Sequence, residues 1–153
     1  MTHRREIRET VLKALYAEEL SRDTWEHILK EIIKPRLESE KDAYKFAENL
    51  FLRTLNHQDE IDEIIQNHIK NWKIERLTTI DKLILRIALC EFLYFDQIPT
   101  KVTINEALEI AKKYSTSKSS NFVNGILDAA LEELRSADRI NKKGRGLIES
   151  SIN

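Results

Sequence analysis

The segment from residue 80 to residue 92 constrains the fold most, because apolar side chains surround it almost completely. It reads IDKLILRIALCEF. On a helix, two adjacent faces of this segment are apolar, the first with Ile84, Ile87 and Ala88 and the second with Leu85, Leu89 and Phe92. Mainly Lys82 and Arg86 remain for a narrow polar strip. A helix that buries most of its circumference belongs in the middle of a bundle.

The composition favours an all-α protein. The chain has 153 residues, of which 41% are hydrophobic and 33% are charged, with only 3 Gly and 2 Pro. This balance is poor in the residues that strands and turns require. The length fits one domain or two small subdomains with a real hydrophobic core.

Seven helical segments can be predicted from periodicity and capping signals. They are residues 4–20, a segment that follows the capping signal at 23–26, 41–55 after a break at Pro35, 59–71, 78–96, 103–114 and 119–135. Thr78 with Asp81 and Thr103 with Glu106 have the spacing of capping boxes. We therefore predict a seven-helix bundle over residues 1–136, with an N-terminal subdomain at about 1–57 and a C-terminal subdomain at about 58–136. Residues 137–153 are predicted to form a basic, disordered tail.

Several classes of function are disfavoured. No apolar run approaches the roughly 20 residues needed to span a bilayer, and the N-terminus is charged where a signal peptide is apolar, so we expect a cytoplasmic protein. Cys90, the only cysteine, lies in the apolar helix and is interpreted as an inert core thiol. The histidines lack metal-ligand spacing and no glycine-rich phosphate loop is present. We therefore expect no enzymatic activity, no cofactor and no metal site.

Positive charge is concentrated at the two ends of the chain. Residues 18–63 carry 13 acids and 7 bases, whereas residues 3–13 carry four bases and two acids, and residues 135–146 carry five bases and one acid. A further basic group, Lys112, Lys113 and Lys118, lies beside aromatic residues. Bases interleaved with aromatics favour a nucleic-acid surface over a membrane surface, which needs a continuous apolar face.

The first helix continues its buried stripe into arginines. At helical spacing, one stripe contains Arg4, Arg8, Val11 and Leu15. Unpaired arginines cannot follow the stripe into a core, so we expect the first two turns to extend past the bundle and to offer Arg4, Arg5 and Arg8 to a phosphate-bearing partner. The alternative is a solvated, fraying terminus in which Glu6 and Glu9 are the local partners of the arginines.

A second candidate patch comprises Lys113, Tyr114, Lys118 and Phe122. Phe122 lies on the flank of an apolar stripe made by Val123, Ile126, Ala130 and Leu134. Part of its ring is therefore expected to lie outside the core, where it could stack on an unpaired base. The alternative is that both rings only pack neighbouring helices together.

Two residues inside helices need a structural explanation. Glu91 lies near the face of Ile80, Ile84 and Ile87, where a carboxylate needs a partner, and an ion pair is predicted. Gly125 costs its helix about 1 kcal/mol relative to alanine. We interpret this glycine as a site of close helix packing.

The ordered motifs DKLILRIALCEF, IPTKVTINEALEIAKKY and FVNGILD, together with the opening HRREIRETVLKALY, resemble the NusB family of bacterial transcription antitermination factors. The resemblance covers nearly the whole chain. It implies an RNA-binding protein that binds the boxA element of nascent ribosomal RNA leaders together with NusE, a small-subunit ribosomal protein, and suppresses premature termination. It also implies a link to the elongating RNA polymerase through other Nus factors.

The resemblance assigns roles to residues of this sequence. The arginine-rich motif matches Arg4, Arg5 and Arg8, and the aromatic RNA contacts match Tyr114 and Phe122, with Lys113 and Lys118 as phosphate-attracting neighbours. The docking region for NusE matches Glu75, Arg76, Asp81 and Lys82. These lie at the junction that begins with Trp72 and in the first turn of the central helix.

Two rival functions remain open. The first is a NusB-like RNA-binding module acting in ribosomal RNA maturation, as in some ribosomal RNA methyltransferases, which is disfavoured because no catalytic domain follows residue 153. The second is a helical protein-binding scaffold whose basic ends only aid solubility. Salt-dependent RNA binding would distinguish the scaffold from an antitermination factor.

Overall fold

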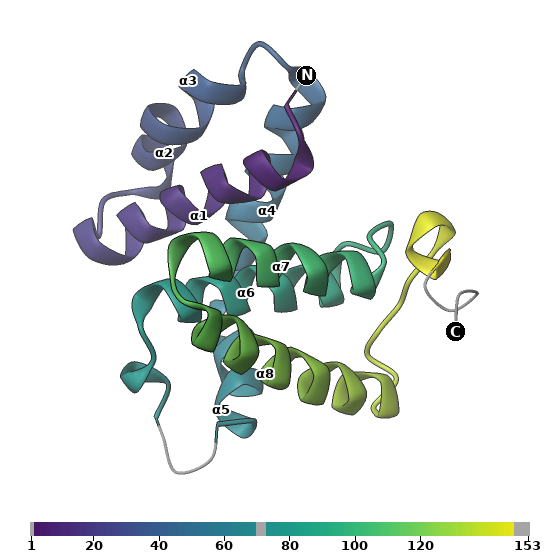
Figure 1. Cartoon of the computed structure of the whole chain (residues 1–153). Helices are drawn as coiled ribbons and strands as arrows, with labels where there is room; N and C mark the ends of the chain where they lie inside the picture. The colour runs from purple at the N-terminus through teal and green to yellow at the C-terminus, as the bar shows by residue number, and fades with distance from the viewer. Residues whose placement is uncertain (1, 70–72, 149–153) are drawn as a thin grey trace. The chain divides into compact units, whose positions relative to one another are not determined.

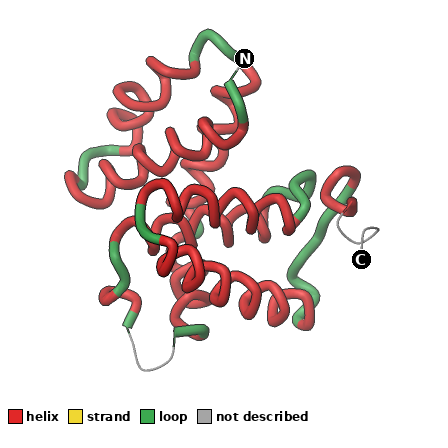
Figure 2. Tube along the Cα trace, in the orientation of Figure 1, coloured by secondary structure: helices red, strands yellow, loops and turns green. Residues whose placement is uncertain are grey.

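A computed structural model describes residues 2–69 and 73–148, and in these residues helices and loops alternate with no strand (Figure 2). The prediction of an all-α fold is confirmed. The chain divides into two compact units, Met1–Asn56 and His57–Asn153. In the described part of the chain, no helix is long and apolar enough to cross a membrane.

The first unit packs the N-terminal helix against two partners. Its elements are α1 (Arg4–Ser21), α2 (Trp25–Ile28), the π-helix η1 (Leu29–Ile33), α3 (Lys34–Leu37) and α4 (Lys41–Asn56). α1 contacts both α4 and the α2–η1 segment (Figure 1). The core between these helices includes Val11, Leu15, Ile33, Leu50 and Phe51. The apolar stripe predicted for the first helix is therefore buried.

The three short elements from Trp25 to Leu37 form one continuous helix, and Pro35 does not break it as expected. The backbone passes directly from α2 into η1 and from η1 into α3, and the N–H of Lys34 donates to the carbonyl of Leu29, five residues earlier. A proline inside a regular α-helix lacks one N–H donor and clashes with the carbonyl four residues before it. The wider π turn precedes Pro35 and accommodates this ring, so the helix continues to Leu37.

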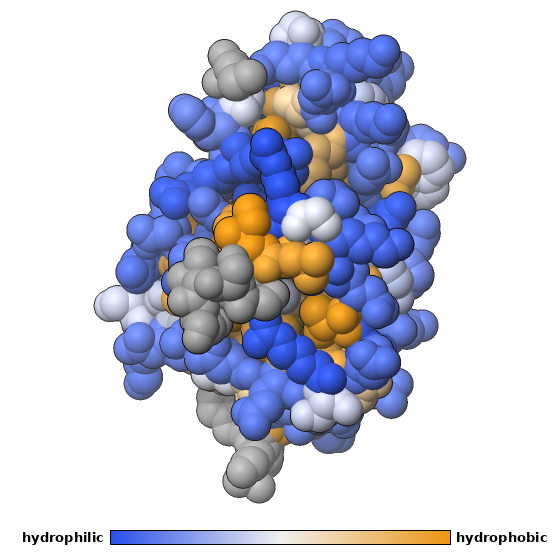
Figure 3. Space-filling view, turned by 90° about the vertical axis from the view of Figure 1, so that its right-hand side faces the viewer, coloured by the Kyte–Doolittle hydropathy of each residue, from blue (hydrophilic) through white to orange (hydrophobic). Residues whose placement is uncertain are grey.

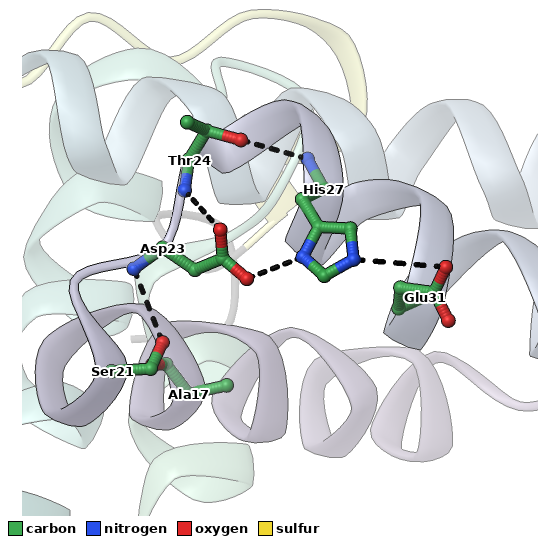
Figure 4. Close-up of polar contacts among 6 residues, drawn as sticks. All are labelled: Ala17, Ser21, Asp23, Thr24, His27 and Glu31. Carbon is green, nitrogen blue, oxygen red and sulfur yellow. Dashed lines mark hydrogen bonds and ion pairs between the residues drawn. The ribbon is translucent and has the colours of Figure 1, made fainter.

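A network of short-range polar contacts fixes the turn between α1 and α2 (Figure 4). The side chain of Thr24 caps α2 by accepting from the N–H of His27 at 3.3 Å, so the cap lies one residue after Asp23, where the capping signal at 23–26 begins. Asp23 accepts from the N–H of Thr24 at 2.9 Å and pairs with the ring of His27. The hydrogen bond with His27, followed by that from Thr24, lowers the pKa of Asp23 below its usual value.

The second unit is built around one buried helix. Its elements are α5 (Gln58–Asn67), the short 3₁₀ helix η2 (Ile74–Arg76), α6 (Thr79–Tyr94), α7 (Thr100–Tyr114), α8 (Ser117–Ser136) and the 3₁₀ helix η3 (Gly144–Leu147). α6 contacts α5, α7 and α8 (Figure 1). Every residue of α6 from Leu83 to Phe92 is buried, and Cys90 is fully buried. The central position predicted for this helix follows from its all-round apolar surface.

Arg86 does not lie on an exposed polar strip, because a carboxylate of α5 draws it into the unit. Its exposed fraction is 4%. Its Nε and Nη2 atoms donate to the two carboxylate oxygens of Asp62 at 2.7 and 2.8 Å. This two-point geometry is the strongest form of an arginine–carboxylate pair, and it joins α5 to α6. Lys82 remains half-buried at the start of the helix.

α7 begins three residues before the predicted position, at Thr100 rather than Thr103. Pro99 occupies the N-cap position, and its carbonyl accepts from the N–H of Thr103 at 3.2 Å. Thr103 is therefore inside the helix, and its hydroxyl donates to Oε1 of the buried Glu91 at 2.7 Å. The pair of Thr103 and Glu106 is thus not a capping box. The Thr78 cap of α6 is as predicted, with its hydroxyl accepting from the N–H of Asp81 at 3.2 Å.

Lys142 and Lys143 are bonded to the end of α6 and the loop after it, which differs from the disordered tail expected over 137–153, of which residues 149–153 lie outside the described residues. The ammonium of Lys142 donates to the carbonyl of Glu91, in the last turn of α6, at 2.9 Å and to that of Phe95, the residue after the helix, at 2.7 Å. The N–H of Lys143 donates to the carbonyl of Asp96 at 3.0 Å. A cation at the C-terminal end of a helix satisfies carbonyls that have no partner within the helix. These bonds attach the segment despite its low hydrophobicity.

The helix count matches the prediction when the continuous helix is counted once. The described residues then contain seven helices: α1, the helix from Trp25 to Leu37, α4, α5, α6, α7 and α8. α5 ends at Asn67, and the predicted continuation to residue 71 falls partly on residues 70–72, which lie outside the described residues.

Candidate nucleic-acid interface

The end of α7 and the start of α8 bring bases and aromatic rings to one short turn. The side chain of Thr116 caps α8 by accepting from the N–H of Ser119 at 2.9 Å, so only two residues separate the helices. Lys113 and Lys118 are exposed on either side of this turn. Nζ of Lys113 lies 5.4 Å from the centroid of the half-buried Tyr114 ring, within cation–π range.

Phe122 lies one turn further along α8 and keeps part of its ring outside the core. It is half-buried, whereas the residues of the adjacent stripe, Val123, Ile126, Ala130 and Leu134, are at most 7% exposed. The angular offset from the stripe is therefore reflected in its exposure. We name the surface of Lys113, Tyr114, Lys118 and Phe122 the turn patch.

Gly125, in the same helix, has no close packing contact. A Cβ atom built on this residue would meet no heavy atom within 4 Å beyond its chain neighbours and the backbone of its own helix. Our interpretation of Gly125 as a site of close helix packing is therefore wrong. The residue is exposed, three positions after Phe122.

The arginines at the start of α1 differ in exposure. Arg4 and Arg5 are exposed, but Arg8 is only 3% exposed, so the expectation that the first two turns extend fully past the bundle is wrong for Arg8. The physical reason is an aromatic ring on α4. The guanidinium carbons of Arg4 and Arg8 lie 3.8 and 5.7 Å from the centroid of Phe46. A guanidinium is weakly hydrated and stacks well on a ring, so it tolerates this position.

Sequence reasoning missed the role of Phe46. The ring belongs to the buried apolar stripe of α4, and it meets arginines that are about 40 residues away in the sequence. A pattern within one helix carries no signal of a contact between two helices. We name Arg4, Arg5 and Arg8 with Phe46 the α1 patch.

The residues expected to dock a partner protein lie in η2 and the first turn of α6. Glu75 and Arg76 are exposed, Lys82 is half-buried, and Asp81 is 6% exposed. Oδ2 of Asp81 accepts from the hydroxyl of Ser119 at 3.0 Å, while Oδ1 is buried with no hydrogen-bond partner among the described residues. Trp72, at the start of the expected docking junction, lies outside the described residues.

Another face of the second unit carries exposed apolar and basic side chains. Among the described residues of this unit, the exposed large hydrophobic side chains are Val102, Leu147 and Ile148. Figure 3 views the side on which η3 lies in Figure 1, and hydrophobic side chains gather in the middle of that face. Beside η3, a pocket is lined by Thr100, Arg135, Ile140, Asn141, Lys142, Lys143, Gly146 and Leu147. No sequence signal pointed to this pocket.

Comparisons with known proteins identify the family. The family model described as "NusB family" matches residues 5–132. A protein named transcription antitermination protein NusB, from Salinibacter ruber, is 46% identical over 148 residues, which are 97% of this chain and 92% of the relative.

Two solved structures resemble the chain. NusB of T. maritima has a TM-score of 0.80 and 39% sequence identity, covering 86% of this chain and 92% of that one. A chain from a crystal structure of the antitermination factors NusB and NusE in complex with dsRNA has a TM-score of 0.78 and 28% identity, covering 85% of this chain and 96% of that one. The match of the family model over most of the chain and the identity to a NusB protein agree with this fold, and the chain belongs to the NusB family.

Proposed function

We propose that this protein is an RNA-binding transcription antitermination factor that binds the boxA element of nascent ribosomal RNA leaders together with NusE. In this role it connects the RNA to elongating RNA polymerase through other Nus factors and suppresses premature termination. Membership of the NusB family supports the proposal, as does a related NusB whose crystal structure contains NusE and RNA.

The observation that carries the proposal is the turn patch. It combines two exposed lysines with two half-buried aromatic rings, and the Lys113 ammonium lies within cation–π range of one of them. Lysines attract phosphates without reading sequence, whereas rings stack on bases that are not paired. The patch therefore fits unpaired RNA better than a duplex, whose stacked bases a side chain cannot reach.

The α1 patch is proposed as a second phosphate-binding surface. Arg4 and Arg5 are exposed and can reach phosphate oxygens, and guanidinium groups bind these with paired hydrogen bonds. Arg8 is buried beside the ring of Phe46, so we propose that it contacts RNA less than Arg4 and Arg5 and mainly holds the α1 patch together.

The proposed docking surface for NusE comprises Glu75, Arg76, Asp81 and Lys82. These charged residues occupy η2 and the first turn of an otherwise apolar central helix. Charges of both signs give register and selectivity to a protein interface. Reversal of the charges at Glu75 and Arg76, which are exposed, should weaken NusE binding without disturbing the core.

The sharpest test is substitution of Phe122 by alanine, with RNA affinity and stability measured on the same variant. Loss of a base-stacking ring should weaken binding of single-stranded boxA RNA by about 1 to 3 kcal/mol. The free energy of unfolding should fall by less than the roughly 3 to 5 kcal/mol typical of a core phenylalanine, because the ring is only half-buried. Fluorescence anisotropy and urea denaturation supply the two values.

Phe92→Ala is the matched control, since Phe92 is fully buried in α6. This variant should lose stability and keep its RNA affinity in the folded fraction. A duplex and a scrambled single strand test the preference for unpaired boxA RNA. Unchanged RNA affinity of the Phe122 variant would remove the ring from the site, and absence of salt-dependent RNA binding by the wild type would favour the helical protein-binding scaffold instead.

A further inference from the structure

We propose that Ser119 and Asp81 form a hydrogen-bonded bridge through which binding of the partner protein strengthens binding of RNA. Asp81 Oδ1 is the acceptor that the docked partner engages, and Ser119 connects Asp81 to the turn patch. This inference rests on the proposed function and states how its two surfaces communicate.

The bridge joins segments that are distant in the sequence. The hydroxyl of Ser119, in the first turn of α8, donates to Oδ2 of Asp81, in the first turn of α6, at 3.0 Å. The hydroxyl of Ser115 donates in turn to the oxygen of Ser119 at 2.9 Å. Hydrogen bonds in such a chain polarise one another, so each strengthens the next. Both serines belong to the segment that lies between Tyr114 and Phe122.

Asp81 is therefore one of the groups that hold the turn patch in place, together with the bond from the Ser120 hydroxyl to the carbonyl of Leu108. Ser119 also donates its N–H to Thr116, which caps α8. Ser119 is thus held by the helix cap through its backbone and by Asp81 through its side chain. Any change in the position of Asp81 is transmitted to the turn that presents the lysines and rings.

The other oxygen of Asp81 is the acceptor that we assign to the partner. Asp81 is 6% exposed, and its Oδ1 atom is buried with no hydrogen-bond partner among the described residues. Buried polar atoms nearly always have a partner, and one that has none carries a desolvation cost that an incoming donor removes. Asp81 lies among the other residues that we assign to partner docking: Glu75 and Arg76 precede it in the sequence, and Lys82 follows it.

Occupation of Oδ1 requires a small rearrangement. The atom is covered in the free chain, so a backbone N–H or side-chain donor of NusE reaches it only if the first turn of α6 or the groups over it shift. Partner binding then favours one arrangement of Asp81. Because Ser119 is hydrogen-bonded to Asp81, the turn patch takes the arrangement that matches it. Two sites that favour the same arrangement strengthen each other reciprocally.

A coupling measurement tests the bridge. The affinity of labelled single-stranded boxA RNA for the full chain is measured with and without saturating NusE, and the ratio of the two dissociation constants is the coupling factor. For the wild type we expect a factor of about 5 or more. Ser119→Ala removes the bridge, so its coupling factor should fall to about 1, with binding of NusE alone unchanged.

Three further variants separate coupling from a simple structural role. Ser119→Thr keeps the hydroxyl and should restore the coupling factor. Ser117→Ala is the matched control, because it removes an exposed hydroxyl from the same turn, and it should behave as the wild type. Asp81→Asn retains an acceptor for Ser119 but replaces one carboxylate oxygen by a donor. It should therefore weaken NusE binding and reduce the coupling factor.

Each result decides for or against the bridge. A wild-type coupling factor in Ser119→Ala or in Asp81→Asn, with RNA and NusE both bound, would overturn the bridge and leave the proposed function intact. A wild type that binds both ligands without coupling would do the same. A wild type that binds neither RNA nor NusE would overturn both proposals.

Discussion

Individual residues in this protein are held by partners that no local pattern identifies. Arg86 and Glu91 lie in one apolar helix, and each is bonded to another helix, Arg86 to Asp62 and Glu91 to Thr103. A buried charge is tolerated only when a partner satisfies it. The sequence shows that Glu91 needs a partner and places Arg86 on a polar strip, but it cannot show which helix binds either side chain.

Asp62→Ala should be among the most destabilising single changes in the second unit. It removes the carboxylate that binds Arg86 at two points, and the guanidinium of Arg86 is almost completely buried. Leaving one member of a buried pair uncompensated costs about 3 to 5 kcal/mol, and the lower end is expected because Asp62 itself is 23% exposed. Urea denaturation measures this loss. Glu63→Ala, an exposed neighbour on α5, should have little effect, and an equal effect of both variants would contradict the importance of the pair.

Tyr94 should make stability depend on pH in the alkaline range. Burial and the hydrogen bond that its hydroxyl donates to Glu60 raise its pKa from 10.0 to about 12. Because the folded pKa lies above the unfolded value, this stabilisation is complete below pH 10 and is lost as pH rises from about 10 to 12. Unfolding free energies at several pH values should therefore fall more steeply for the wild type than for Tyr94→Phe. Parallel curves would refute a raised pKa.

At the scale of elements, the helices were largely predictable and several of their ends were not. α6 has an apolar surface and a Thr78 cap that are both local, so its place and start follow from the sequence. The helix continues through Pro35 because a π turn precedes it, whereas a proline more commonly ends a helix. α7 starts early because Pro99 occupies its N-cap, whereas the spacing of Thr103 and Glu106 more commonly indicates a capping box. Capping spacing alone does not decide whether a threonine caps a helix or bonds to a neighbouring one.

The candidate surfaces show the same division. The exposure of Phe122 follows from its angle on α8, which the sequence gives. The burial of Arg8 beside Phe46 and the bond of Ser119 to Asp81 depend on contacts between helices, which it does not give. Lys142 is a further example, because its bonds to the end of α6 attach a segment whose composition alone indicates disorder.

Gly125→Ala should stabilise α8. The position is exposed, and an added Cβ meets no heavy atom within 4 Å beyond its chain neighbours and the backbone of its own helix. Replacing glycine by alanine inside a helix raises the free energy of unfolding by up to about 1 kcal/mol, partly because the unfolded chain loses freedom. Thermal denaturation should show a higher Tm. A destabilised variant would reveal packing that the described residues lack, and weaker RNA binding by a stabilised variant would indicate close approach of RNA at Gly125.

At the scale of the whole molecule, charge is distributed unevenly rather than in excess. The net charge is -1, so overall charge gives no attraction to RNA, and binding depends on local groups of bases. The acid-rich stretch from residue 18 to residue 63 and the basic α1 patch both belong largely to the first unit. A test of the α1 patch must therefore separate local charge from net charge.

The double variant Arg4→Ala with Arg5→Ala should weaken RNA binding and flatten its salt dependence. Both side chains are exposed at the start of α1, and each lost phosphate contact lowers the slope of log affinity against log salt by about 0.7 for single-stranded RNA. Titrations at several salt concentrations give the slope, and circular dichroism verifies that helical content is retained. Lys30→Ala with Lys34→Ala changes the net charge equally but removes exposed bases from the acid-rich stretch, so it should leave the slope unchanged. If both double variants flattened the slope by the same amount, net charge, and not the α1 patch, would govern attraction to RNA.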